Sequence, residues 1–340
     1  MKKQKQYEIS IVAKIILILL PLVIAIISLC IGRIGISPLD VIRSVFANIF
    51  GGEKLQPIFE LTLWKLRLPR ILLALLAGAG LSVAGCAFQG LFSNPLATPD
   101  TLGVASGASF GAVLALLFGF DILGIQVMSF MFGIFAVALT IISGNTKGSR
   151  NLQGVVLAGI MIGSLFSALI SLVKYVADTE SELPAITYWL MGSLDSASYK
   201  SLLFGAPAII VGIVILFLVR WRMNLLTLSD EEATSAGVNI KALRLAVMLC
   251  ATMITASCVS MCGQVGWVGL LVPHMCRMKF GSNYKTLIPC SVFIGSAFLV
   301  AVDTAARSMS AAPLPISILT AILGAPFFII LMRKSGGFFG

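Results

Sequence analysis

Long apolar runs recur along this chain and limit what it can fold into. Several of them reach about 18 or more residues with few charges, which is enough for a helix to cross a hydrocarbon layer of about 30 Å. Charged residues make up 11% of the chain and its mean hydropathy is +1.02. A soluble domain would carry about 25% charged residues. The sequence therefore predicts an all-α polytopic membrane protein.

The runs predict about ten transmembrane helices in a single domain that covers residues 1–340. The predicted spans are 11–31, 68–90, 102–119, 123–143, 153–175, 200–219, 243–262, 265–277, 286–304 and 315–332. The basic start MKKQKQYEIS precedes the first span, which we interpret as uncleaved. No small-x-small signal-peptide site follows it, and Leu29 is bulky where lipoprotein-type cleavage before Cys30 would need a small residue.

The distribution of Lys and Arg among the loops predicts the orientation. With the N-terminus inside, the inner segments carry the whole formal net charge of +10 and the outer segments sum to zero. Because cytoplasmic loops are enriched in Lys and Arg, we expect both termini in the cytoplasm. The basic balance then reflects topology and gives no reason to expect a nucleic-acid partner.

The stretch GLFSNPLATPDTLGVASGASFG, residues 90–111, interrupts two apolar runs. Its two prolines cannot continue a helix, so it predicts an inner turn, after which Asp100 or Thr101 caps the next helix. The following glycines at four-residue spacing favour close approach of another helix; generic small-residue packing is the alternative. These glycines are Gly103, Gly107 and Gly111, and Gly159, Gly163 and Ser167 repeat the spacing in the fifth span.

The sequence offers little that could power transport by itself. Gradient-driven carriers usually keep ionisable residues in the middle of the membrane, but the predicted span centres are almost free of them. The only histidine, His274, lies near the inner end of the eighth span, and Asp303 and Arg307 form an i,i+4 pair at the outer end of the ninth. The phosphate-binding motif G-x-x-x-x-G-K-[ST] is absent. If transport uses ATP, another polypeptide must bind it.

The segment TLSDEEATSAGVN, residues 227–239, predicts a short polar helix in the largest inner loop. Ser229 and Glu232 form a capping box, the acids Asp230 and Glu231 favour the helix N-terminus, and Gly237 can end the helix in the left-handed conformation. The small residues on this helix, which could nest in a cleft of a partner, are Ala233 and Ala236. A well-capped connector without a partner is the alternative.

The seven cysteines lie in or beside apolar runs without a regular framework. We interpret them as small apolar fillers of a helix bundle. A metal site is the alternative, because Cys258 and Cys262 are one helical turn apart and His274 and Cys276 follow.

Several long motifs, in order, resemble the membrane permeases of binding-protein-dependent ABC importers that take up ferric siderophores, haem and cobalamin. The resemblance runs over nearly the whole chain from about residue 60. It rests on LRLPRILLALLAGAGLSVAGCAFQGLFSNPLATPDTLGVASGASFGA (66–112), YWLMGSL (188–194), LSDEEATSAGVN (228–239), GQVGWVGLLVPHMCR (263–277), AVDTAAR (301–307) and LPISILTAILGAPFF (314–328).

The resemblance implies a homodimer of ten-span subunits in the cytoplasmic (inner) membrane of a bacterium, with the substrate path along the dimer axis. It implies two cytoplasmic P-loop ATPase subunits, which bind ATP and Mg, and one extracytoplasmic substrate-binding protein. The chain itself would be a transport subunit without a cofactor and not an enzyme. A ferric siderophore is the first expectation for the substrate, and cobalamin, haem or another metal chelate are the alternatives.

The same resemblance assigns roles to residues. It implies that Asn94 and Leu96 form a cytoplasmic gate, that Gly148 and Ser149 contribute a second gate, and that residues 227–239 are the coupling segment for the ATPase. Outer arginines would receive acidic residues of the binding protein; these are Arg67, Arg70 and Arg307. Two readings from other classes are a gradient-driven carrier and a membrane redox or metal protein that uses His274 and the cysteines.

Overall fold

The computed structural model describes residues 10–52, 54–144, 152–228, 230–309 and 314–334, and the described residues form helices and loops without a strand. A helix lies at each of the ten predicted spans. These helices are α1 (Ile11–Cys30), α4 (Leu68–Leu91), α5 (Val104–Leu117), α6 (Ile122–Gly144), α7 (Leu152–Val176), α9 (Tyr199–Val219), α11 (Ile240–Cys262), α12 (Val268–Phe280), α13 (Tyr284–Ser308) and α14 (Ile316–Lys334).

Among the described residues, seven stretches are long and apolar enough to cross a membrane: α1, the continuous helical run Pro57–Leu91, α6, α7, α9, α11 and α13. The polytopic all-α class is therefore confirmed. Of the other three predicted spans, α5 and α14 contain shorter apolar helices, and α12 is a helix of 13 residues. That these three also cross the membrane stays a prediction.

The structure adds helices where the sequence analysis expected loops. Residues between the first two spans form α2 (Pro38–Phe50), α3 (Pro57–Glu60) and the π-helix η1 (Leu61–Arg67), which continues into α4. A further helix, α8 (Glu182–Leu190), precedes α9. The remaining short elements are the 3-10 helices η2 (Pro99–Leu102) and η3 (Arg222–Thr227), and α10 (Asp230–Ser235).

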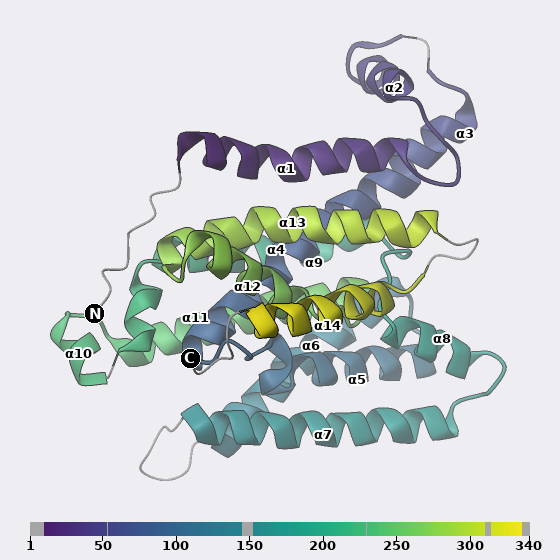
Figure 1. Cartoon of the computed structure of the whole chain (residues 1–340). Coiled ribbons are helices and arrows are strands. Elements are labelled where there is room, and N and C mark those ends of the chain that lie inside the picture. The colour runs from purple at the N-terminus through teal and green to yellow at the C-terminus, as the bar shows by residue number, and fades with distance from the viewer. Residues whose placement is uncertain (1–9, 53, 145–151, 229, 310–313, 335–340) are drawn as a thin grey trace.

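Helix α4 forms the centre of the bundle and packs against α9, α11, α12 and α13 (Figure 1). In the most apolar 18-residue segment of this helical run, 83% of the residues are buried. In the corresponding segments of α1 and α7, at the periphery, the shares are 17% and 22%. Glycines allow this central position: a side chain at Gly85 would overlap the backbone of Gly269 on α12, and one at Gly78 would overlap the backbone of Gly295 on α13. Without a hydrophobic driving force between helices in lipid, such close packing is a main source of association.

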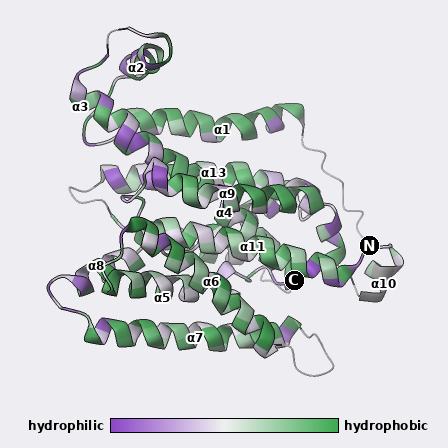
Figure 2. Ribbon diagram, turned by 180° about the vertical axis from the view of Figure 1, so that it is seen from behind, coloured by the Kyte–Doolittle hydropathy of each residue, from purple (hydrophilic) through white to green (hydrophobic). Residues whose placement is uncertain are grey.

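The two ends of the bundle carry different short elements. Figure 1 places α10 at one end of the bundle, and α2, α3 and α8 at the other. Apolar residues run along the spans, and hydrophilic ones gather near helix ends (Figure 2). We call the end with α10 the inner end and the end with α8 the outer end, after the orientation that the basic residues favour.

Candidate docking and gating sites

The three outer arginines lie close together but are not freely exposed. Arg67 and Arg307 are 5% and 9% exposed, and the side chain of Arg70 is 12% exposed. The expected contact with a binding protein would need accessible guanidiniums, and these three are largely buried. Their neighbours explain why: each guanidinium is held by carbonyls or carboxylates from elements far away in the sequence.

Arg67 caps the end of α1. Its Nη1 donates to the carbonyl of Leu29 at 2.5 Å and, more weakly, to that of Cys30 at 3.4 Å, and its Nη2 donates to the carbonyl of Ile34. The last carbonyls of a helix have no partner within the helix, and a cation there also opposes the helix dipole. Arg67 therefore fixes the chain where it leaves α1.

Arg70 joins three separate elements. Its Nε donates to Asp303 Oδ1 on α13 at 2.8 Å, and its Nη1 donates to Asp195, in the loop after α8. Tyr188 on α8 donates its hydroxyl to the other oxygen of Asp195 at 2.5 Å. Arg70 Nη2 is buried without a hydrogen-bond partner. The Nη2 group is therefore the part of this guanidinium that makes no hydrogen bond within the cluster.

Asp303 and Arg307 form the predicted i,i+4 pair, with 3.7 Å between Asp303 Oδ2 and Arg307 Nε. Asp303 is fully buried. Arg307 also donates to the backbone carbonyl and, at 2.6 Å, to the hydroxyl of Ser28 on α1. We call Arg67, Arg70, Asp195, Asp303 and Arg307 the outer charge cluster; its formal charge is positive because three guanidiniums face two carboxylates.

Asp195 is the member of this cluster that lies in a loop and retains contact with solvent, with a side chain that is 30% exposed. Partial burial opposes its ionisation, but the Tyr188 hydrogen bond and the positive charge of Arg70 outweigh that effect and hold the pKa of Asp195 below its ordinary value. The carboxylate is therefore ionised whenever the cluster is assembled near neutral pH.

At the inner end, the predicted turn follows α4. Ser93 adopts a positive φ of 47°, and Asn94 Oδ1 accepts the backbone N–H of Leu96 at 2.9 Å. This short side-chain bond closes a local turn and leaves the Leu96 side chain 49% exposed. The structure thus holds the two proposed gate residues together on a turn. Gly148 and Ser149 lie outside the described residues.

The capping expected of Asp100 or Thr101 was wrong. Gly103 precedes α5 with φ +72° and ψ 14°, a left-handed conformation that glycine adopts without strain. Thr101 instead accepts the backbone N–H of Thr98 at 3.0 Å, and Asp100 accepts the hydroxyl of Ser106 at 3.4 Å. The polar side chains therefore organise η2, and a glycine makes the transition into α5.

The glycines of α5 meet two different helices. A side chain at Gly107 or Gly111 would overlap α6, at Ala136 and at the Met128 carbonyl respectively. Gly103 lies instead against Gly163 on α7. Nearby, a side chain at Gly159 of α7 would overlap the backbone of Thr101. The expected close packing is present, although the three glycines do not serve one partner helix.

The segment predicted to couple to an ATPase contains α10, and Gly237 follows with φ +77°, as the left-handed termination required. Glu232 and Ala236 are exposed. Ala233 is fully buried in the chain's own core, so the expectation that it nests in a partner was wrong. Ser229 lies outside the described residues, and the structure describes Asp230 and Glu231 only in their backbone.

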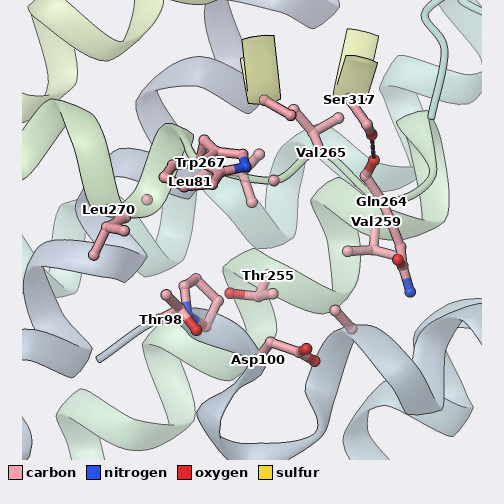
Figure 3. A pocket seen from close by; sticks show the side chains of 15 residues that line it. Leu81, Thr98, Asp100, Thr255, Val259, Gln264, Val265, Trp267, Leu270 and Ser317 are labelled. Atoms are coloured by element: carbon pink, nitrogen blue, oxygen red, sulfur yellow. Dashed lines mark hydrogen bonds between the residues drawn. The ribbon is translucent and has the colours of Figure 1, made fainter. Parts of the chain in front are cut away.

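A cavity of about 340 Å³ lies among α4, α5, α11, α12 and α14, beside η2 (Figure 3). Its wall includes the indole of Trp267, which precedes α12 with a strained φ of 68°. Ser317 donates to the carbonyl of Gln264, whose amide donates to Ser109 at 2.8 Å. This cavity was not predicted from the sequence; Gly263 and Gly266, two glycines just before Trp267 and α12, were the available signal.

No three His, Cys, Asp or Glu side chains in the described ranges converge on a metal position. The rings of His274 and Phe328 form a T-shaped pair, with 5.5 Å between their centroids. Cys262 donates to the carbonyl of Cys258 at 2.8 Å, and six of the seven cysteines are buried. These contacts agree with packing roles.

Comparison with known proteins identifies the family. The chain is 41% identical over 318 residues to the molybdate import system permease protein of Haemophilus influenzae, covering 94% of each chain. It is 36% identical to the probable iron chelatin transport system permease protein of Helicobacter pylori, over 88% of this chain and 90% of that one. A solved inward-facing structure of a putative metal-chelate type ABC transporter matches with a TM-score of 0.85 and 40% identity, over 94% of this chain and 99% of that chain. The model of the FecCD transport family matches residues 18–334, and the chain, an integral membrane permease, belongs to this family.

Proposed function

We propose that this chain is the membrane subunit of an ABC importer and works as a homodimer. Two cytoplasmic ATPase subunits bind ATP and Mg, and one extracytoplasmic protein delivers the substrate. The observation that carries the proposal is the match of 94% of the chain to the solved metal-chelate type ABC transporter at a TM-score of 0.85. The outer charge cluster and the α10 segment supply a plausible contact at each end.

At the outer end, the binding protein docks through acidic side chains. The net positive formal charge of the outer charge cluster supports this step. Arg67 contributes indirectly, by holding the end of α1 in place, because backbone carbonyls there already accept from its guanidinium. Charge-assisted bonds to arginine are the expected chemistry, and docking is therefore salt-sensitive.

At the inner end, the ATPase contacts the segment around α10. Glu232 and Ala236 are exposed there, while the buried Ala233 anchors the helix to the bundle. A movement of this helix can pass to α11, because α10 contacts α11 and Ala233 is part of the same core. The turn with Asn94 and Leu96, together with Gly148 and Ser149, then closes or opens the cytoplasmic side of the path.

For the substrate, we propose a ferric siderophore, with cobalamin and haem as alternatives of the same kind. The iron chelatin permease of Helicobacter pylori supports an iron chelate. The permease of Haemophilus influenzae, named for molybdate import, supports a second candidate, the molybdate oxyanion. A largely apolar path that binds its cargo weakly would leave most of the selection to the binding protein.

The decisive experiment is a gentle purification of the tagged chain from its native host. We expect a P-loop ATPase in equal amount, and ATP hydrolysis that rises when loaded binding protein is added. Uptake of radioactive iron from several siderophores, and of radioactive molybdate, is then measured in cells with and without the gene. Purification of the chain alone under several mild conditions would contradict the importer assignment, and molybdate uptake without iron uptake would contradict the siderophore.

Variants at the two ends test the contacts separately. Deletion of residues 229–237 should abolish transport while the protein still inserts, and Ala236→Arg should weaken ATPase association; Lys241→Ala, exposed at the same end, is the matched control. Arg70→Gln and Arg307→Gln should weaken docking of the binding protein, provided that each variant is shown to be folded. Unchanged docking affinity would restrict the arginines to holding the outer end together.

A further inference from the structure

Helix α2 turns its apolar side away from the protein. Large apolar side chains at i, i+3, i+7 and i+10 form one face, and each is more than half exposed: Leu39 68%, Ile42 55%, Phe46 61%, Ile49 65% and Phe50 75%. A helix on the surface of a soluble protein presents the opposite pattern, with its apolar stripe toward the core. The face formed by these five residues, which we call the α2 apolar face, therefore needs a nonaqueous surrounding.

The other side of α2 is fixed to the protein by polar contacts. Ser44 donates to Glu60 Oε1 at 2.7 Å and accepts from Trp64 Nε1 at 2.8 Å, and Asn48 donates to Glu60 Oε2 at 3.1 Å. Val41 packs beside them with Leu63 in a small core. The orientation of α2 about its own axis is thus set, and it cannot turn its apolar face inward without breaking this network.

The position of α2 in the fold indicates what covers the face. Figure 1 shows α2 end-on while α1 and the other spans run across the view, so α2 lies roughly perpendicular to them, at the outer end and to the side of α1; Figure 2 shows the same from behind. The neighbouring end of α1 exposes Ile26 at 57% and Ile27 at 48%. Helix α1 is long and apolar enough to cross a membrane, and only 17% of its apolar segment is buried in the protein, as expected of a surface in contact with lipid. The α2 apolar face continues it at the level where the span ends.

We propose that α2 is an interfacial helix that lies in the outer leaflet of the membrane, parallel to its plane. The α2 apolar face enters the boundary between headgroups and acyl chains, as the apolar side of an amphipathic helix does. Arg43, exposed at the margin of this face, reaches the lipid phosphates with its long side chain. Ser44 and Asn48 bond to Glu60, the residue before η1. A helix α2 held by lipid would therefore also hold η1, which ends at Arg67.

Spin labels can locate this face without any transport assay. Cys30 is the cysteine of the chain that is not buried, so a Cys30→Ser parent receives Ile42→Cys or Phe46→Cys, with Lys54→Cys in the exposed loop after α2 as the matched control. Each labelled protein is reconstituted in phospholipid vesicles. Collision rates are measured with oxygen, which dissolves in lipid, and with a water-soluble nickel chelate.

We expect labels at Ile42 and Phe46 to collide with oxygen and to lose collisions with the nickel chelate, and the label at Lys54 to show the reverse. Nickel-accessible labels at both positions would overturn the proposal, because α2 would then lie in water. Labels shielded from both reagents would overturn it in favour of a protein partner, such as a second copy of the chain. Because the readout is independent of substrate, ATPase and docking, its failure would leave the proposed function untouched.

Discussion

The outer and inner ends of this bundle are closed by different kinds of interaction. At the outer end, Arg70 connects α4 with α13 and with the loop after α8 through two carboxylates, and Arg307 and Arg67 add α1. At the inner end, a side-chain bond within one turn holds Asn94, and backbone-to-backbone approaches at glycines bring α5, α6 and α7 together. The outer contacts are pairs of opposite charges, in which carboxylates of another protein could replace those of this chain. The inner contacts depend on shape, and they leave short exposed segments beside a cavity.

The largest effect is expected from removing the carboxylate at the centre of the outer charge cluster. Asp303→Ala leaves Arg70 and Arg307 with less compensation in a buried site, and breaking one partner of a buried pair costs about 3–5 kcal/mol. We expect a marked loss of thermal stability of the purified protein in detergent. Glu180→Gln, at an exposed outer position, is the matched control. Equal stability of the two variants would show that the cluster is not what holds this end together.

The inner end should respond to size and not to charge. Gly107→Ala places a methyl group against Ala136 and the Phe132 carbonyl, and overpacking of this kind costs about 1–3 kcal/mol. Gly107→Leu should prevent α5 from packing on α6. Gly35→Ala, which meets nothing within 4 Å, controls for the loss of a glycine. A stable, active Gly107→Leu variant would make the glycine spacing incidental.

These two variants also indicate what could be predicted from the sequence. The helices and the Gly107 contact follow from local patterns, because apolar length and four-residue spacing are readable along one segment. The partners of Arg70 are not, because Asp195 and Asp303 lie 125 and 233 residues away in the sequence. A similar limit concealed α2: its pattern is amphipathic, but only the positions of Ser44 and Glu60 reveal that the apolar side faces out.

A smaller, pH-dependent effect is expected at Asp195, the partly exposed partner of Arg70. Its pKa is lowered in the folded protein, so its contribution to stability is present above the ordinary value of 3.8 and is lost as the pH falls through the lowered pKa. Asp195→Asn should therefore be less stable than the parent at pH 7 but not at strongly acidic pH. Thermal unfolding of both proteins along a pH series measures this. A stability difference that persists unchanged at the acidic end would indicate that Asp195 acts through hydrogen bonding and not through its charge.

The smallest change in stability is expected at the inner end beyond α10. Gly237 has φ +77° and no atom within reach of an added side chain, so Gly237→Ala meets only the backbone cost of the left-handed conformation, roughly 1–2 kcal/mol. That cost falls on a short, largely exposed segment whose buried residue is Ala233, and it should leave the melting temperature nearly unchanged. If residues 227–239 transmit movement from an ATPase, the same substitution should still reduce the stimulation of ATP hydrolysis by loaded binding protein. A variant that is fully coupled would make the segment a simple connector, whereas one that loses overall stability would show that the inner end is more tightly integrated than its contacts indicate.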